Sequence, residues 1–245
     1  MNRTAPALLF ALIASSPVWA TPALHWSYEG QGGPEHWSEL GDEFKTCTTG
    51  QYQSPIDIQR VFDTKMPALA LNFHIDTETI VNNGHTIQIT VQDGDDFMLD
   101  GDAFVLKQFH FHTPSENHIF GRAFPLEAHF VHANAAGELA VVAVMFEQGA
   151  ENKTLTPLID SIPQRQDSVE IMKQRVDLAG LLPQDKHYHR FSGSLTTPPC
   201  TEGVRWLVMK QPVMLSTRQL AKFQQALKHA NNRPLQRLHG RIVVD

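Results

Sequence analysis

The sequence predicts one mostly β domain of the α+β class, with a large, mainly antiparallel twisted central sheet and short helices at its periphery. Runs of β-branched and aromatic residues recur along the chain, glycine-containing turn dipeptides separate them, and few segments show helical spacing. The 245 residues are 42% hydrophobic and 19% charged, which is enough apolar material for one large core, and no linker divides the chain.

The first 20 residues have the features of a signal peptide. Arg3 precedes an apolar run from Ala7 to Ala14, and Ala20 provides the small residue at which a signal peptidase cuts. We expect a mature domain over residues 21–245, exported to the periplasm or secreted. The apolar run is much shorter than the roughly 20 residues that cross a bilayer, so we expect no membrane span in the mature form.

The elements follow in order along the chain. Residues Thr21 to Asp57 show no sustained period and are expected to wrap around the domain. Strands are expected over Thr86 to Val91, Phe104 to His112, Leu126 to His132, Leu139 to Phe146 and Val204 to Val208. Turns are expected at Asn83-Gly84, Asp93-Gly94, Asp100-Gly101 and Ala136-Gly137. Helices are expected over Lys153 to Asp160, Asp177 to Leu181 and Thr217 to His229, the last with Ser216 as N-cap.

Charge and cysteine content limit the possible partners. The formal net charge is −6 and lysines and arginines form no cluster, so a nucleic-acid partner is excluded. The two cysteines, Cys47 and Cys200, are expected to form a disulfide in an exported chain. The sequence is compatible with either a monomer or a homodimer.

A possible metal site lies on two of the expected strands. Side chains alternate between faces, so Gln108, His110 and His112 share one face. Two residues along a strand span about 6.6 Å, close enough for both rings to reach one ion. On a neighbouring strand the same alternation groups Glu127 with His129, which could supply a third imidazole.

Three neutral imidazoles suit one Zn²⁺ per chain and leave a fourth position for water, as in catalytic zinc sites. A histidine pair two residues apart can also be a plain polar strand face, but Gln108 and Glu127 each precede an expected ligand by two residues, where groups that orient an imidazole belong. His187 and His189 have the same spacing without such neighbours and are interpreted as structural.

Several motifs together carry a family resemblance. Gln108-Phe-His110-Phe-His112-Thr-Pro-Ser115-Glu116 and Pro125-Leu-Glu127-Ala-His129-Phe-Val131-His132 resemble the zinc motif of the α-class carbonic anhydrases. Other stretches resemble the family in the same order, namely Gln53 to Ile58, Asn82 to His85, Ser194 to Cys200 and Asn231 to Pro234. The resemblance spans nearly all of the mature chain.

This resemblance implies an activity and a role for each matching residue. The activity is reversible hydration of carbon dioxide to bicarbonate by a zinc-bound hydroxide. Thr196 would orient the hydroxide and donate its own hydrogen bond to Glu116, while His85 would carry protons to solvent, with Asn83 and Gln88 ordering water. Residues matching the substrate pocket of the family are Val131, Val141, Leu195, Thr196, Thr197, Val204 and Trp206.

The resemblance also supports the disulfide, because exported members have one at the positions of Cys47 and Cys200. Two positions depart from the better-known animal members: Asn117 stands where a histidine is expected, and Phe191 where a tyrosine is common. Neither change removes a metal ligand.

Two alternatives remain at this level. The spacing of His110, His112 and Glu116 also fits the first metal motif of a cupin, although no glycine precedes His129 as the second cupin motif requires. A non-catalytic relative of the carbonic anhydrases would lack a zinc ligand, whereas all three are present here.

Overall fold

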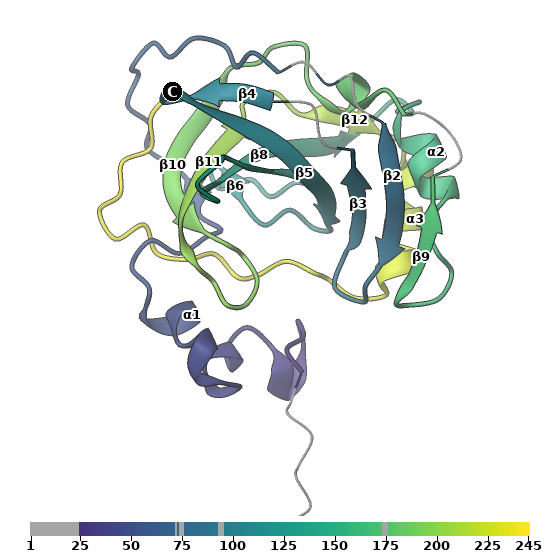
Figure 1. Ribbon diagram of the computed structural model, residues 1–245, viewed down its shortest axis with the longest axis horizontal. Helices are drawn as coiled ribbons and strands as arrows, with labels where there is room; N and C mark the ends of the chain where they lie inside the picture. The colour runs from purple at the N-terminus through teal and green to yellow at the C-terminus, as the bar shows by residue number, and fades with distance from the viewer. Residues whose placement is uncertain (1–24, 72, 74–75, 93–95, 173–175) are drawn as a thin grey trace, which may run out of the picture.

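The computed structural model describes residues 25–71, 73, 76–92, 96–172 and 176–245. The expected signal peptide and the Asp93-Gly94 turn therefore lie outside the described residues. In the part that is described, a broad twisted sheet forms the centre of the molecule and the helices lie at its margins (Figure 1). This is the fold class that the sequence predicts.

Ten strands form the main sheet, in the order β10-β11-β8-β7-β5-β3-β2-β9, with β4 paired to β5 and β12 paired to β8. The pairs β11–β8 and β12–β8 are parallel and the others are antiparallel. The strands are β2 (Thr77–Asn82), β3 (Ile87–Val91), β4 (Asp96–Leu99), β5 (Asp102–His112), β7 (Leu126–Ala133), β8 (Leu139–Gln148), β9 (Ser168–Ile171), β10 (Tyr188–Ser194), β11 (Glu202–Met209) and β12 (Val213–Leu215). A separate parallel pair consists of β1 (Asp57–Ile58) and β6 (His118–Ile119).

All five expected strands are confirmed, as β3, β5, β7, β8 and β11. The strands that the sequence did not predict are mostly short or lie near a sheet edge, where polar residues interrupt the alternation of apolar residues. The Asp100-Gly101 turn joins β4 to β5, and both residues have positive φ, 56° and 93°, as a two-residue hairpin of the primed type requires.

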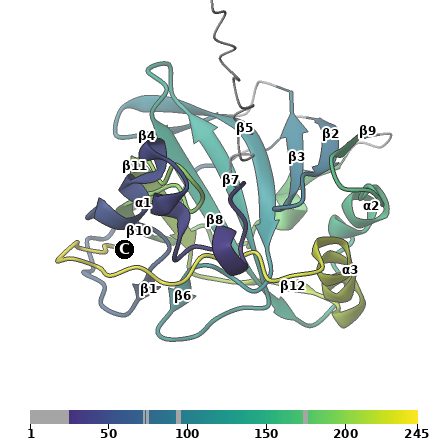
Figure 2. The same cartoon turned by 90° about the horizontal axis from the view of Figure 1, so that it is seen from below.

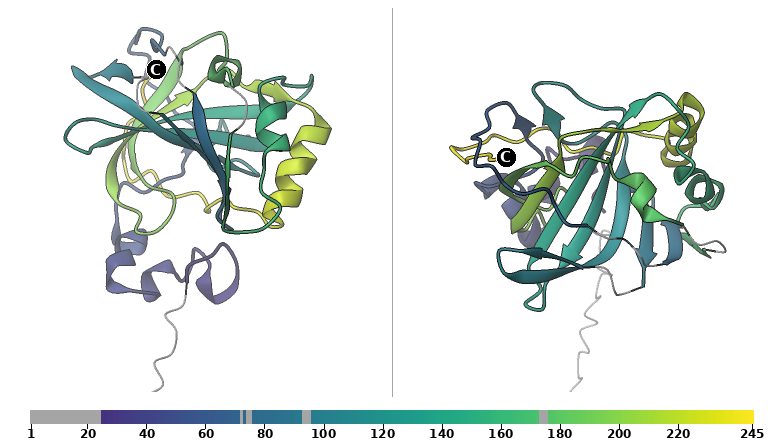
Figure 3. Two further views of the ribbon diagram at one scale, coloured as in Figure 1. Left: turned by 45° about the vertical axis from the view of Figure 1, so that its right-hand side comes forward. Right: turned by 90° about the horizontal axis from the view of Figure 1, so that it is seen from above.

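The helices are α1 (Thr46–Thr49), α2 (Leu155–Asp160) and α3 (Thr217–Leu227), and the third expected helix is a single 3-10 turn at Leu178–Leu181. Ser216 caps α3 as predicted, because its side chain accepts from the Gln219 N–H while the Gln219 side chain accepts from the Ser216 N–H. α2 and α3 lie next to each other beside β2 and β9 (Figure 3).

The N-terminal segment follows the surface beside the sheet and is not wholly irregular as expected (Figure 2). It contains α1 and short 3-10 helices at Gly30–Gly32, Trp37–Glu39 and Asp42–Phe44. Helices of three or four residues make only about one turn, which is too short to show a helical period in the sequence. Among the described residues, no helix is long and apolar enough to span a bilayer.

The alternation along β8 explains how the sheet separates core from site. Val142, Val144 and Phe146 point into the larger apolar cluster, which α3 covers with Leu220 and Phe223. The intervening side chains of β8 point to the opposite face, into a smaller cluster with Phe191, Val204 and Trp206. Strands buried on both faces give a rigid platform for side chains that project from them.

Candidate metal centre and active site

Three histidines meet on one face of the sheet at the β5–β7 pair. His110 and His112 project from β5, and His129 lies directly opposite His110 on β7. Ligand atoms of the three rings lie within 4.8 Å of one another, and among the described residues this is the only such group of histidine, cysteine or acidic side chains. The adjacent Phe109 and Phe111 point to the other face and into the core, so the alternation expected for β5 is present.

One nitrogen of each ring is already hydrogen-bonded. Gln108 Oε1 lies 2.9 Å from His110 Nδ1, the Asn231 carbonyl 2.7 Å from His112 Nδ1, and Glu127 Oε1 2.9 Å from His129 Nε2. These contacts fix the tautomers. They leave the lone pairs of His110 Nε2, His112 Nε2 and His129 Nδ1 available to bind a metal ion. Within the described ranges the buried His112 Nε2 has no hydrogen-bond partner. A buried imidazole nitrogen without a hydrogen-bond partner, close to one nitrogen of each of two other histidines, is the arrangement expected of a metal ligand.

Burial sets the charge of the three rings. It lowers the pKa of His110 and His129 well below the ordinary value, and neighbouring imidazoles lower it further. The pKa of His112 is also lowered by burial, against the opposing effect of its bond to the Asn231 carbonyl. The rings are therefore neutral near pH 7, which is the form that binds metal.

Glu127 is fully buried and accepts four hydrogen bonds. Besides His129, its donors are the backbone N–H groups of Glu116 and Asn117, at 2.7 and 2.9 Å, and the Asn117 side-chain amide at 2.8 Å. Burial raises the Glu127 pKa, and these donors act in the opposite direction. Asn117, the departure noted in the sequence, thus supplies two of the bonds that hold the carboxylate beside its histidine.

Glu116 lies just beyond the three rings, with Oε2 3.5 Å from His112 Nε2 and 3.9 Å from His129 Nδ1. Burial raises its pKa well above the ordinary value, while the Arg233 N–H, which donates to Oε1 at 2.8 Å, and the Thr196 side chain favour the charged form. The guanidinium of Arg233 donates to the carbonyl of Cys47 and to Gln53 and Ser54. Arg233 therefore connects the carboxylate to the N-terminal segment.

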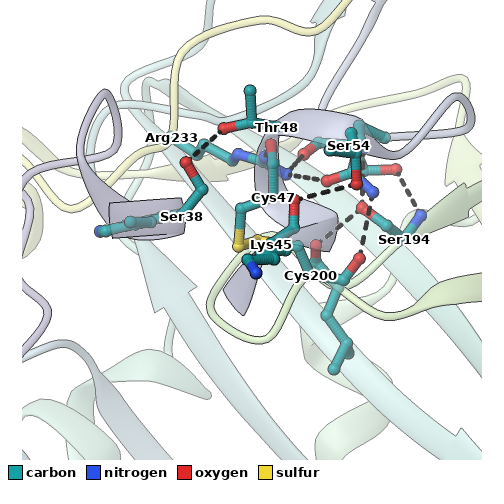
Figure 4. The surroundings of a disulfide bond; sticks show 12 residues. Ser38, Lys45, Cys47, Thr48, Ser54, Ser194, Cys200 and Arg233 are labelled. Carbon is teal, nitrogen blue, oxygen red and sulfur yellow. Dashed lines mark hydrogen bonds between the residues drawn. A yellow bond between two sulfur atoms is a disulfide. The ribbon is translucent and has the colours of Figure 1, made fainter. Parts of the chain in front are cut away.

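A disulfide anchors the loop that carries Thr196. Cys47 and Cys200 are bonded, as predicted, with their Cα atoms 5.0 Å apart. The Cys200 N–H donates to the Thr197 carbonyl at 2.9 Å, and the Cys47 carbonyl accepts from Arg233 (Figure 4). The bridge joins the loop that carries Thr196 and Thr197 to α1, 153 residues earlier in the chain.

A cavity of about 180 Å³ opens above the three histidines. Its walls contain most of the residues that the sequence singled out, namely Asn83, His85, Gln88, Gln108, Val131, Val141, Leu195, Thr196, Thr197 and Trp206. Of the residues assigned to the substrate pocket, only Val204 does not line this cavity, because it packs in the apolar cluster that also contains Val141 and Trp206. Phe191, the second departure, stacks on Trp206 with ring centroids 6.0 Å apart.

His85 lies at the mouth of this cavity. Trp26 stacks on its ring with 3.7 Å between centroids, and His25 lies 5.2 Å away in a parallel orientation. Burial lowers the His85 pKa, as do His25 and His229, while Asp167 raises it. The Asn83 side chain accepts from the His85 and Thr86 N–H groups and so fixes the turn.

Several residues of the site were not assigned from the sequence. Trp26 and Tyr28 line the cavity from the N-terminal segment, where no period indicated a role. Burial raises the Tyr28 pKa well above its ordinary value, so the phenol stays neutral. Asn231 and Arg233 belong to the stretch Asn231 to Pro234, which resembles the carbonic anhydrase family. That match was the feature of the sequence that could have indicated their place in the site.

The comparisons with known proteins agree with this geometry. The profile of the eukaryotic-type carbonic anhydrases matches residues 32–245. The chain belongs to this family. It is 50% identical to a carbonic anhydrase of Pectobacterium carotovorum over 225 residues, 92% of each chain, and 50% identical to one of Klebsiella pneumoniae over 238 residues, 96% of this chain and 97% of the other. The structure of the α-carbonic anhydrase from Thermovibrio ammonificans with the inhibitor sulfanilamide superposes with a TM-score of 0.88 at 43% identity, covering 90% of this chain and 99% of that one.

Membership of the carbonic anhydrase family confirms the resemblance and shows that the cupin alternative is wrong. Relatives of this similarity over nearly the whole chain show that the protein is an enzyme, and its reaction is the reversible hydration of carbon dioxide.

Proposed function

We propose that the reaction takes place at one zinc ion per chain, held by His110, His112 and His129. The observation that carries this is the convergence of three ring nitrogens whose partner nitrogens are all hydrogen-bonded. A set of three neutral imidazoles is the donor set of catalytic zinc sites. When bound, zinc would supply the Lewis acidity that makes a water molecule nucleophilic near neutral pH.

Thr196 and Glu116 orient the nucleophile in this proposal. A carboxylate can only accept, so in this proposal the Thr196 hydroxyl would donate to Glu116, whose charged form it favours, and would keep its lone pairs for a hydrogen bond from the nucleophile. The backbone N–H of Arg233 holds the carboxylate from the other side. Fixing the nucleophile before attack removes part of the entropic barrier.

Carbon dioxide binds against the apolar wall of the cavity, which Val131, Val141, Leu195 and Trp206 form. A small non-polar molecule gains from leaving water for such a surface and makes no demand for hydrogen bonds there. Thr197 lies beside this wall and can bind the more polar bicarbonate. Trp206 is held in place by a hydrogen bond from its indole to the Ser194 carbonyl.

His85 carries the proton that each turnover releases. It lines the cavity and is only partly buried, so it can accept from water inside and release to solvent outside. Gln88, which lines the same wall, would order the intervening water.

The compartment is also part of the proposal. A disulfide that links distant parts of the chain is typical of an exported protein, and it supports the interpretation of residues 1–20 as a cleaved signal peptide. Sequencing the N-terminus of protein from the periplasm or the medium is expected to begin at Thr21. A mature N-terminus at Met1 would contradict this.

The activity is tested by stopped-flow hydration of carbon dioxide together with metal analysis of the purified protein. We expect one zinc per chain, and loss of both zinc and activity in His112→Ala. His187→Ala is the matched control, because His187 is exposed and, within the part of the chain that the structure describes, its side chain pairs with Asp185 alone. Zinc without hydration would contradict the proposed activity and favour a non-catalytic relative of the carbonic anhydrases, and absence of zinc from an active enzyme would refute the assignment of the metal.

A further inference from the structure

A second hollow, of about 370 Å³, lies between α2, α3 and the end of β2, apart from the metal cavity. α2 and α3 stand beside the sheet margin there (Figure 3). Its apolar floor contains Ile159, Ile162, Pro163 and Ala226, and its polar lining consists of Asn82, Asp160, Gln164, Lys222, Gln225 and Lys228. We call this hollow the lysine groove.

The charges of the lysine groove suit an anion. Lys222 and Lys228 are exposed, and neither ammonium group forms an ion pair with any residue that the structure describes. Asp160 is the one carboxylate among the described lining residues, and side-chain amides supply further donors. Because the whole chain has a net charge of −6, two lysines that line one hollow and form no ion pair within the described residues are a local exception that attracts small anions.

The groove continues toward the turn that carries His85. A smaller hollow of about 120 Å³ shares Lys228, Asn82, Gln164 and Ala226 with it and extends to Gly84 and His229. His229 Nε2 lies 3.1 Å from the Gly84 carbonyl, and its ring lies 6.0 Å from that of Tyr28, which lines the metal cavity. His229 therefore lies between the smaller hollow, which it lines, and the metal cavity, which Tyr28 lines.

We propose that the lysine groove, whose continuation reaches Gly84, binds phosphate ions and holds them near the turn that carries His85, as acceptors of the proton that catalysis releases. This inference rests on the proposed shuttle role of His85. Inorganic phosphate takes up its second proton near neutral pH, somewhat above the ordinary histidine pKa of about 6.5, so transfer from the imidazolium to the dianion is close to balanced and slightly favourable. The imidazolium of His85 loses one proton and becomes neutral, and the dianion HPO₄²⁻ gains it and becomes H₂PO₄⁻.

The charge of the lysine groove also favours release of phosphate after it has accepted the proton. The dianion interacts more strongly with Lys222 and Lys228 than the monoanion does, so protonation weakens the binding and promotes release. Asp160 in the groove and Asp167 near His85 oppose the attraction. The hollow is large enough for a phosphate ion with part of its hydration shell.

The kinetic test compares carbon dioxide hydration in phosphate and in an imidazole buffer, which is not anionic. In the double variant Lys222→Gln/Lys228→Gln, the phosphate concentration for half-maximal turnover should rise about fivefold, the order expected when two exposed charges are lost. Turnover in imidazole should be unchanged. The control is Lys45→Gln/Lys65→Gln, which removes the same charge from residues that do not line the groove. Equal effects in both double variants, or none in either, would overturn the proposal.

A binding measurement separates this inference from the proposed function. Phosphate added to the wild-type protein should shift the NMR signals of the Gln164 and Gln225 side-chain amides in a saturable way, and the Lys222→Gln/Lys228→Gln variant should lose the shift. Absence of the shift in an active enzyme would refute the groove alone. A saturable shift in a protein that does not hydrate carbon dioxide would refute the proposed function and leave the phosphate site in place.

Discussion

His132 makes the stability of the fold sensitive to acid. It lies on the core face of β7, fully buried, with its ring 4.8 Å from that of Phe97 and 6.3 Å from that of Phe73. Nδ1 lies 2.9 Å from the Phe130 carbonyl. Burial lowers the His132 pKa to about 4, against the opposing effect of backbone hydrogen bonds.

The lowered pKa of His132 determines the direction and the size of the change in unfolding free energy with pH. Between about pH 6.5 and pH 4 the unfolded chain protonates His132 and the folded chain does not, so acid favours unfolding and the loss of stability grows as the pH falls through this window. The pKa difference of roughly 2.5, at 1.36 kcal/mol for each pH unit, gives a total of roughly 3 kcal/mol. Most of it, about 2.5 kcal/mol, should be lost by pH 4.5.

The assay is urea unfolding of the wild type and of His132→Leu at pH 7.5 and at pH 4.5. Groups common to both proteins cancel in the difference between their unfolding free energies. This difference should move by about 2.5 kcal/mol in favour of the variant at the lower pH. His239→Asn, at an exposed histidine, should show no such change. A difference between wild type and His132→Leu that does not depend on pH would refute the reasoning.

Three further predictions concern the disulfide and the site. Replacing Cys47 and Cys200 by serine should lower the unfolding free energy by up to about 5 kcal/mol, because the bridge closes a loop of 153 residues; reductant should reproduce the loss in the wild type only. Glu127→Gln removes the carboxylate that accepts from His129, and chelator competition should show zinc affinity about 10- to 100-fold lower. His85→Ala should slow turnover on the order of ten- to a hundred-fold in weak buffer, and imidazole at high concentration should restore it, whereas unchanged turnover would exclude a shuttle role.

The sequence alone determined the class of the fold and the identity of the central site. Alternation over Gln108 to His112 in β5 and along β7 places His110, His112 and His129 on one face with Gln108 and Glu127, because the side-chain period of a strand is two. A slip of one residue would turn Glu127 toward the core. The Ser216 cap and the Asp100-Gly101 hairpin were also predictable, since both are set by local backbone chemistry.

Only the tertiary structure decided how distant segments complete the site. The carbonyl that holds His112 comes from Asn231, and the N–H that holds Glu116 comes from Arg233, both more than 100 residues away in the chain. Trp26 reaches His85 from a segment without any period. The sequence assigned Val204 to the cavity wall, but its side chain packs in an apolar cluster and does not line the cavity. An apolar strand residue can lie either in the core or in the wall of a pocket, and apolar character alone does not distinguish these two positions. These contacts depend on loop paths that no local pattern specifies.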